Sequence, residues 1–237
     1  MGLVYEYLMF AGKSSEDFKC HISGSGTFVS PSRDIESIAV PGRNGDLHID
    51  NGRFSNVIIT YPAFITEDFD QNYSALKAFL LSKTKQERLA DSYHPDHFRK
   101  GIFHGSIDPK MTTRNKAGSF DLTFDCDPRM FLKEGEKVHV FTNAGTLKNN
   151  TAFPSKPFIM AYGTGTLTIG SISLQITSAN EYTNIDCDIQ EAYKGTTNCN
   201  TNIVLTNGEF PELLPGNNEI SFTGLTSIEI TPRWWTI

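Results

Sequence analysis

The chain has 237 residues, of which 38% are hydrophobic and 17 are phenylalanine, so a disordered chain is excluded and one large or two ordinary domains are expected. The formal net charge of −6 gives no general electrostatic reason to bind nucleic acid or an anionic membrane. No apolar stretch approaches the roughly 20 residues of a membrane helix. Met1–Phe10 carries Glu6 and no basic residue, so we expect no signal peptide and assembly in a cytoplasm.

The first half of the chain is predicted to be mainly β. Two apolar β-type runs, Ile35–Val40 and Phe54–Tyr61, are joined through a stretch at Ala39–Leu47 that carries a Pro-Gly and an Asn-Gly turn signal. This stretch contains no nucleophile, no set of metal ligands and no phosphate cradle. We therefore predict an exposed loop, in which a lone Arg43 would be a solvated charge.

One amphipathic helix interrupts the β pattern between Asp70 and Lys83. Apolar residues recur there at three- and four-residue spacing: Tyr73, Leu76, Phe79 and Leu80. Asp70 is the predicted N-cap, and Lys83 and Lys85 suit the negative end of the helix dipole. The apolar face holds no cluster of polar side chains, which indicates a packing element laid on a sheet.

A half-buried strand is predicted to end at Cys126. Apolar and polar residues alternate strictly through Ser119–Cys126, and Asp127-Pro128 stops the pattern. A charged, glycine-containing break follows at Lys133–Lys137. We therefore predict two domains, residues 1–135 and 136–237.

The second half of the chain is predicted to be a β-sandwich. Leu167–Ile169 and Ile172–Leu174 flank Gly170-Ser171, which suits a type II′ hairpin turn and pairs Ile169 with Ile172. Further alternating pairs predict short strands with turns between them: Ile185 with Cys187 and Ile189, Ile220 with Phe222, and Ile228 with Ile230.

Candidate catalytic and metal-binding residues are weak. His94, Asp96, His97 and His104 are the nearest approach to a metal cluster, but Pro95 breaks any helix that would align them. There is no G-x-S-x-G sequence, and no acidic pair falls in a recognisable motif. We therefore predict that the protein is not an enzyme and has no metal or other cofactor.

The four cysteines, Cys20, Cys126, Cys187 and Cys199, lack the spacing of a zinc site. In a reducing compartment we expect free thiols that act as small buried hydrophobic groups. A disulfide between Cys187 and Cys199 is the alternative.

Both tryptophans of the chain stand in one dipeptide, after Pro232 and Arg233. On a strand, Trp234 and Trp235 would point to opposite faces, so that one fills the core and the other is directed outward. An outward aromatic ring usually needs a partner surface, which makes Arg233 and Trp235 candidate interface residues. Two core tryptophans that cap a small sandwich are an equal alternative.

Four segments, taken in order, resemble those of the distal tail (Dit) proteins of long-tailed, non-contractile bacteriophages, and the resemblance runs from about residue 5 to the end. These segments are Ala39–Leu47, Arg88–Ser92, Phe124–Pro128 and Phe210–Asn218. The resemblance implies a mainly β protein. It would combine an N-terminal tail-tube-like β-sandwich or split barrel that carries one α-helix with a C-terminal galectin-like β-sandwich.

The same resemblance implies a structural hub in the virion, at the tip of the phage tail. Six copies would form a ring that joins the tail tube and the tape-measure protein to the tail-associated lysin, fibre or receptor-binding protein, with phage DNA passing through the channel. The turn residues Pro41, Gly42, Arg43, Asn44 and Gly45 are then further candidate interface residues. A carbohydrate-binding module for host attachment is the alternative function. Some members of the family carry insertions that bind sugar, for which this chain has no room.

Overall fold

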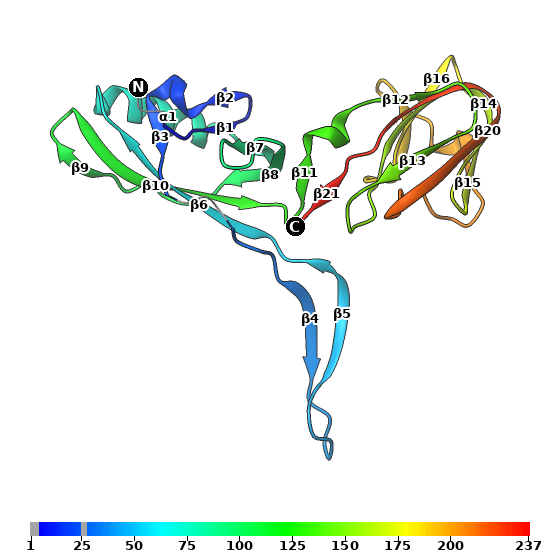
Figure 1. Cartoon of the computed structure of the whole chain (residues 1–237), viewed down its shortest axis with the longest axis horizontal. Helices are drawn as coiled ribbons and strands as arrows, with labels where there is room; N and C mark the ends of the chain where they lie inside the picture. The colour runs from blue at the N-terminus through cyan, green and yellow to red at the C-terminus, as the bar shows by residue number, and fades with distance from the viewer. Residues whose placement is uncertain (1–4, 25–27) are drawn as a thin grey trace. The chain divides into compact units, whose positions relative to one another are not determined.

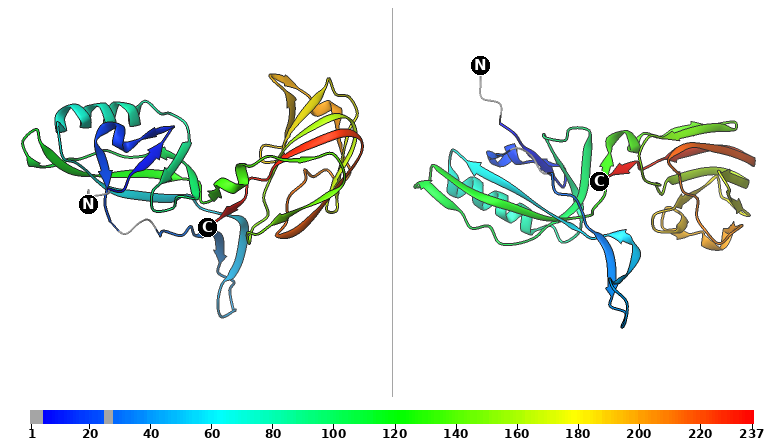
Figure 2. Two further views of the ribbon diagram at one scale, coloured as in Figure 1. Left: turned by 45° about the horizontal axis from the view of Figure 1, so that its top comes forward. Right: turned by 60° about the horizontal axis from the view of Figure 1, so that its bottom comes forward.

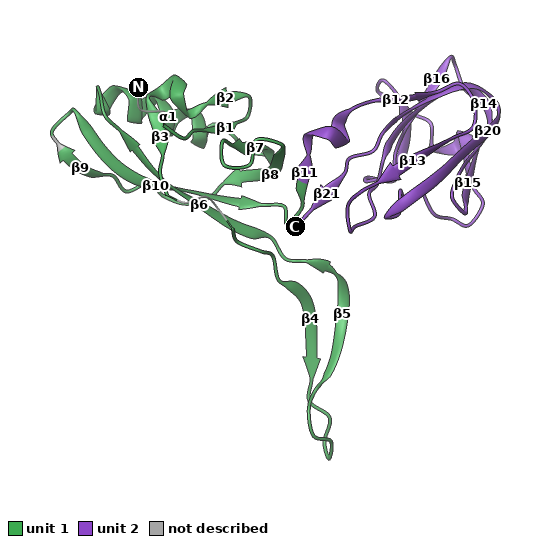
Figure 3. Ribbon diagram, viewed as in Figure 1, with its two compact units in different colours: residues 1–130, 237 green, residues 131–236 purple. Residues whose placement is uncertain are grey.

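The structure, a computed structural model, describes residues 5–24 and 28–237. Within these ranges the chain is mainly β with one α-helix (Figure 1), which confirms the predicted fold class. It divides into two compact units, residues 1–130 with 237 and residues 131–236 (Figure 3), and each unit has its own hydrophobic core. A division into domains at residue 135 stays a prediction. No helix among the described residues is long and apolar enough to cross a membrane.

Unit 1 contains an antiparallel sheet in the order β2-β1-β7-β8-β10-β6-β3, and β9 also pairs with β10. The bounds of its strands are β1 (Leu8–Phe10), β2 (Lys13–Ser14), β3 (Cys20–Ile22), β6 (Val57–Ile65), β7 (Glu87–Asp91), β8 (His97–Phe103), β9 (Lys110–Thr113) and β10 (Ala117–Cys126). A short 3₁₀ helix, η1 (Ser15–Phe18), lies between β2 and β3.

The core of unit 1 lies between this sheet and the helix α1 (Phe69–Leu81), which runs along one face of the sheet (Figure 2). Alternate residues of β6 and β10 are buried, as the period-2 patterns at Val57–Tyr61 and Ser119–Cys126 predict. Leu76 and Leu80 of α1 are 1% exposed and pack into the same core. The helix is therefore a packing element, as its amphipathic pattern indicates.

The predicted cap of this helix was wrong. The N-cap is Asp68, in a left-handed conformation, and its side chain makes no capping hydrogen bond. The backbone N–H of Asp70 instead donates to the side-chain oxygen of Asn115, 3.2 Å away. The last turn contains no basic residue, since Lys83 lies beyond the helix end at Leu81. Tertiary contacts thus replace local capping at the start of this helix.

A long hairpin of unit 1, here called the arm, forms a two-stranded sheet of its own from β4 (Arg33–Ile38) and β5 (Leu47–Phe54). Figure 1 shows that the arm projects away from the sheet that α1 covers. The exposed loop expected at Ala39–Leu47 is present, but the strand that follows it, β5, begins at Leu47 and not at the apolar run expected from Phe54. The loop, residues 39–46, is the tip of the arm.

Unit 2 contains strands in the order β12-β20-β14-β16-β17-β18, with β13 on β20 and β15 between β14 and β19. Their bounds are β12 (His139–Phe141), β13 (Gly145–Asn149), β14 (Phe158–Ile169), β15 (Ile172–Ile176), β16 (Tyr182–Asp186), β17 (Glu191–Lys194), β18 (Thr197–Asn198), β19 (Ile203–Leu205) and β20 (Gly216–Thr231). The remaining elements are β11 (Met130–Leu132), β21 (Trp235–Thr236) and the 3₁₀ helices η2 (Lys133–Glu136) and η3 (Asn200–Asn202).

The hairpin of β14 and β15 has the predicted register. Ile169 pairs with Ile172 and Leu167 pairs with Leu174. Gly170, at the first turn position, has a φ of 58°, as a type II′ turn requires. The turn chemistry and the apolar pattern therefore specify the same pairing.

Two predictions for unit 2 were wrong in detail. Ile220–Phe222 and Ile228–Ile230 belong to one 16-residue strand, β20, whose register against β14 shifts near Gly163. The predicted alternation of Ile185, Cys187 and Ile189 stops early, since Ile189 lies beyond the end of β16 and is 57% exposed.

Candidate interaction surfaces

One face of the arm is largely apolar and open to solvent, with Glu36 as its charged member. The register pairs Ile38 with Leu47 and Glu36 with Ile49, and because directly opposite residues share a face, Ile38, Leu47 and Ile49 lie together. They are 39%, 43% and 42% exposed. A two-stranded ribbon is at best marginally stable alone in water, so an apolar face on such a ribbon indicates a surface that another molecule covers.

The opposite face of the arm carries Ser37, His48 and Asp50 together with Ile35, which is 47% exposed, and the base of the arm is polar. Ser37 pairs with His48, and the hydroxyl oxygen and Nδ1 lie 3.0 Å apart. Two ion pairs cross the strands, Arg33 with Asp50 at 3.0 Å and Arg53 with Asp34 at 2.6 Å. The hydrogen bond from Arg53 lowers the pKa of Asp34. These contacts fix the register of a ribbon that has no core of its own.

The candidate residues Pro41, Gly42, Arg43, Asn44 and Gly45 lie together at the tip of the arm, and all are exposed. The N–H of Arg43 donates to the carbonyl of Val40, 3.2 Å away, and Gly42 has a φ of 79°. This is the geometry of a turn with proline at its second position and glycine at its third. The Pro-Gly signal therefore shapes the tip and leaves the Arg43 side chain free to meet a partner.

Arg233, the candidate in unit 2, makes an ion pair inside its own unit. Its two terminal nitrogens donate to the carboxylate of Asp186 at 2.6 and 2.9 Å. Burial on its own raises the pKa of Asp186, but the hydrogen bond and charge of Arg233, with backbone N–H groups of Asp188 and Ile189, lower that pKa overall. The Arg233 guanidinium therefore holds the end of the chain in place, and its role at an interface stays a prediction.

The two tryptophans differ in burial, as opposite faces of a strand predict. Trp234 is 6% exposed and belongs to the core of unit 2. Trp235 is half-buried: its ring stacks on Phe153 with centroids 4.4 Å apart, and its Nε1–H donates to the carbonyl of Pro154 at 2.9 Å. The part of the Trp235 ring that remains exposed is the part available to a partner.

Glycine is required at the break that precedes this sandwich. A Cβ atom at Gly135 would lie 2.3 Å from the backbone nitrogen of Trp234. The N–H of Arg233 donates to the carbonyl of Gly135 at 2.8 Å, and the N–H of Leu132 donates to the carbonyl of Trp234 at 2.9 Å. The end of the chain is therefore held against residues 132–135 by backbone hydrogen bonds.

The segment Arg88–Ser92 performs a structural role in unit 1. The Asp91 carboxylate accepts a hydrogen bond from the Tyr61 hydroxyl at 2.7 Å and lies 3.1 Å from Nδ1 of His94. The Ser92 hydroxyl accepts from the N–H of Tyr7 at 3.0 Å and donates to the carboxylate of Glu6 at 2.5 Å. The pocket beside Asp91 has a volume of only about 10 Å³, about the size of one water molecule, so it offers no room for a substrate.

The described residues hold no group of three His, Cys, Asp or Glu side chains placed to bind a metal ion. Burial lowers the pKa of His97, helped by the neighbouring His94. All four cysteines are free, in agreement with the expected thiols. Burial raises the pKa of Cys20, Cys126 and Cys187 to about 12, so these thiols are unreactive.

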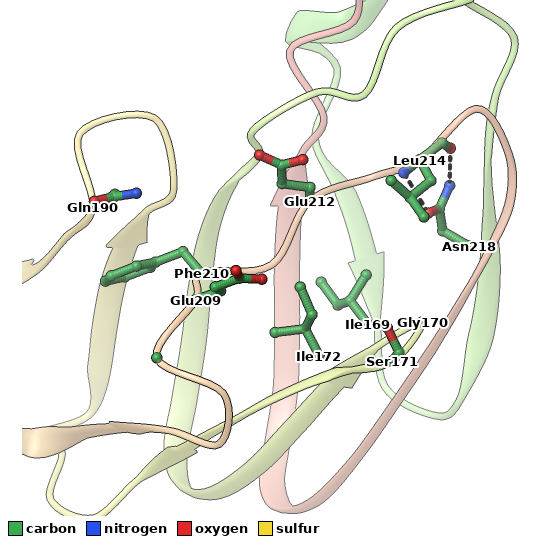
Figure 4. A pocket seen from close by; sticks show the side chains of 11 residues that line it. Ile169, Gly170, Ser171, Ile172, Gln190, Glu209, Phe210, Glu212, Leu214 and Asn218 are labelled. Carbon is green, nitrogen blue, oxygen red and sulfur yellow. Dashed lines mark hydrogen bonds between the residues drawn. The ribbon is translucent and has the colours of Figure 1, made fainter. Parts of the chain in front are cut away.

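Sequence reasoning missed a pocket in unit 2, with a volume of about 460 Å³ (Figure 4). One wall comes from the segment Phe210–Asn218, which supplies Phe210, Glu212, Leu214 and Asn218. The turn Gly170-Ser171 with its flanking isoleucines and the turn residue Gln190 complete the lining, together with Gly208 and Glu209. Three stretches of chain, residues 169–172, Gln190 and residues 208–218, thus meet here, which no local sequence pattern could indicate.

No protein-family model matches this chain, and no curated protein sequence matches it. Solved structures do match. The Dit protein of phage SPP1, described as a paradigm of the hub adsorption apparatus in phages that infect Gram-positive bacteria, is similar with a TM-score of 0.78 and 14% identity. The match covers 99% of this chain and 100% of that one.

The baseplate of phage P2 in its activated conformation also contains a similar chain. The structure with Ca matches at a TM-score of 0.56 and 12% identity, over 96% of this chain and 98% of that chain. The structure with Sr matches at 0.55 and 12%, over 97% and 98%. This chain therefore has the fold of a phage distal tail protein over its whole length.

Proposed function

We propose that this chain is a structural distal tail protein, located in the virion at the tip of a long phage tail and assembled in the host cytoplasm. Six copies form a ring around a channel. One face of the ring meets the tail-tube and tape-measure proteins, and the other meets the tail-associated lysin, fibre or receptor-binding protein.

The observation that carries this proposal is the likeness to the SPP1 Dit protein over 99% of this chain and 100% of that one. Both compact units are included in so complete a match, so the likeness is not limited to one common β-sandwich. The role in SPP1, a hub of the adsorption apparatus, is the role that we transfer to this chain.

The arm supports the formation of a ring. Its face of Ile38, Leu47 and Ile49 needs a cover, and a second copy of the chain supplies one in a way that repeats around a closed ring. Closure leaves no copy with an uncovered arm. The candidate residues at the tip, Pro41 to Gly45, then contact the neighbouring copy.

A passage for DNA suits the charge of this protein. The net charge of −6 repels a polyanion, so DNA would slide through the ring without being retained. The proposed mechanism is geometric and requires no catalytic residue, cofactor or metal.

Immunogold labelling of purified virions tests the location directly. Antibodies raised against the full chain should label the tail tip, and an antibody against the major capsid protein serves as the control on the same grids. Label on the capsid alone, or no label on intact virions that contain the protein by mass spectrometry, would contradict the proposal.

Sugar binding is the second candidate function, and the polar lining of a groove in unit 2 is the observation in its favour. Its volume is about 240 Å³, and its lining includes three asparagines, Asn180, Asn198 and Asn202. Its aromatic residue, Tyr182, is not free to stack on a sugar, because the Lys194 ammonium lies 4.7 Å from the ring centroid. We expect simple saccharides to bind no better than millimolar, and calorimetry that finds micromolar affinity would establish this second function.

A further inference from the structure

The pocket built by the segment Phe210–Asn218 combines an apolar floor with negative charge. Ile169 and Ile172 line it together with Glu209 and Glu212, and in Figure 4 Glu209 is the glutamate nearer to Ile172. The lining contains no lysine, arginine or histidine. Among the residues that the structure describes, neither glutamate has a hydrogen-bond or ion-pair partner. The pocket therefore presents two uncompensated carboxylates next to aliphatic surface.

The part of the wall that follows Glu212 is held by hydrogen bonds. The side-chain oxygen of Asn218, a residue that is 4% exposed, accepts from the N–H of Leu214, and its amide nitrogen donates to the carbonyl of Leu214, both at 2.8 Å. Leu213 exchanges two backbone hydrogen bonds with Ser155, at 2.9 and 3.0 Å. The backbone on the C-terminal side of Glu212 is thus fixed before any ligand arrives, which lowers the entropic cost of binding.

The volume of about 460 Å³ lies within the range of small-ligand pockets and exceeds what one water or ion would fill. An ammonium or guanidinium group complements two carboxylates, and the aliphatic stem of the same side chain complements Ile169 and Ile172. Lysine and arginine are the protein side chains that carry both parts. The Phe210 ring, also in the lining, adds a surface on which a cation can rest.

We propose that this pocket is a docking site for a lysine or arginine side chain on an extended segment of a partner protein. The identity of the partner as another tail protein rests on the proposed function, whereas the preference of the pocket for a cation rests only on its lining. If the chain formed no ring, the pocket could still bind a cation. If the pocket bound no cation, the chain could still form a ring.

The test is NMR of the full chain with methyl-labelled isoleucine and leucine, titrated with n-butylguanidinium. n-Butylurea, which has nearly the same shape and no charge, is the matched control ligand. We expect the methyl signals of Ile169, Ile172 and Leu214 to shift and saturate with the cation, and the urea to bind about tenfold more weakly or less, since hydrogen bonds to charged groups are the stronger ones.

Matched variants separate the site from the overall charge. Glu209→Gln/Glu212→Gln should weaken binding of the cation by about tenfold or more, as the loss of two charge-assisted hydrogen bonds requires. Glu134→Gln/Glu191→Gln removes the same two charges from exposed positions outside the pocket and should leave the affinity unchanged. Equal binding of n-butylurea, or equal weakening by both double variants, would overturn the proposal. So would tighter saturation of the same methyl signals by CaCl₂ or by N-acetylglucosamine.

Discussion

Two hairpins of this protein share the same apolar alternation and differ in what surrounds them. The β14–β15 hairpin is flanked by β20 and β16 on one strand and by β19 on the other, and Leu167 and Leu174 are 0% exposed. Among the described residues no further strand pairs with the arm, and its aliphatic residues remain about as open as Ile38, at 39%. An alternating pattern predicts that one face of a hairpin will be buried. Only the tertiary structure shows whether the same chain or another molecule buries it.

This difference separates folding from assembly. Burial of the β14–β15 face contributes to the stability of one chain, through apolar area removed from water. Burial of the arm face contributes nothing until a second molecule arrives. Substitutions in the β14–β15 hairpin should therefore change the free energy of unfolding, and substitutions in the arm should change self-association.

The largest effect on folding is expected from Leu174→Ala. This truncation leaves a cavity in the core of unit 2 and should lower the free energy of unfolding by about 2–5 kcal/mol. Leu47→Ala, the same change on the arm, should alter that free energy by no more than about 0.5 kcal/mol. Urea unfolding followed by circular dichroism measures both. A cost for Leu47→Ala as large as that for Leu174→Ala would show that the arm packs within its own chain.

The next largest effect is expected from breaking the ion pair of unit 2. Asp186→Asn removes one partner of the half-buried Arg233 and should lower the free energy of unfolding by about 1–3 kcal/mol near pH 7. Asp34→Asn removes a partner from the exposed pair of the arm and should leave the thermal midpoint nearly unchanged.

The pH dependence sharpens the same prediction. Because the folded protein lowers the pKa of Asp186, its contribution to stability is fully present above the unfolded value of about 4 and is lost as pH falls through the folded pKa. Thermal melts between neutral pH and pH 3 should show a smaller acid-induced loss for Asp186→Asn than for the wild type. Parallel curves for the two proteins would contradict this reading of the pair.

A smaller effect is expected at the two hairpin turns. Gly170 and Gly45 have φ values of 58° and 82°, which a residue with a Cβ atom adopts at a cost. Gly170→Ala should lower the free energy of unfolding by about 1 kcal/mol, since its turn fixes strands of the core. Gly45→Ala should instead speed hydrogen exchange only at amides of the arm, with unfolding unchanged. Equal losses of stability would contradict the separation of the arm from the core.

The smallest effect on folding, and the largest on assembly, is expected from Ile38→Asp. The residue is exposed, so the free energy of unfolding of the isolated chain should change by at most about 0.5 kcal/mol. Ser37→Asp places the same charge on the opposite face of the arm, next to His48, and is the control. Sedimentation velocity should show that Ile38→Asp prevents self-association and that Ser37→Asp does not. Equal behaviour of the two variants would exclude the apolar face as the interface.

The sequence predicts best where several local signals agree. At Leu167–Leu174 the apolar period and the turn glycine specify one register, and the structure has it. The helix, expected at Asp70–Lys83, lies at Phe69–Leu81, and its cap differs because Asn115, distant in sequence, satisfies the first turn. A contact between residues distant in sequence, such as Asn115 with the first turn of the helix, cannot be predicted from a local sequence pattern.

The arm and the pocket show the limit of such reasoning. Strand β5 alternates Leu47 and Ile49 with polar residues, a usable signal, but the apolar run was expected to resume only at Phe54. The pocket depends on three stretches of chain that the fold of unit 2 brings together, so the placement of Glu209 and Glu212 beside Ile172 could not be predicted from the sequence. The segment Phe210–Asn218 could be recognised from its sequence, but its role in this pocket could not.

The mass of the assembly tests the central claim most directly. Size-exclusion chromatography with light scattering should be run on the full chain at high concentration, alone and with the tail-tube or hub partner of the same phage. The account predicts a ring with six times the mass of one chain, formed alone or on the partner. A chain that stays monomeric under both conditions would contradict it.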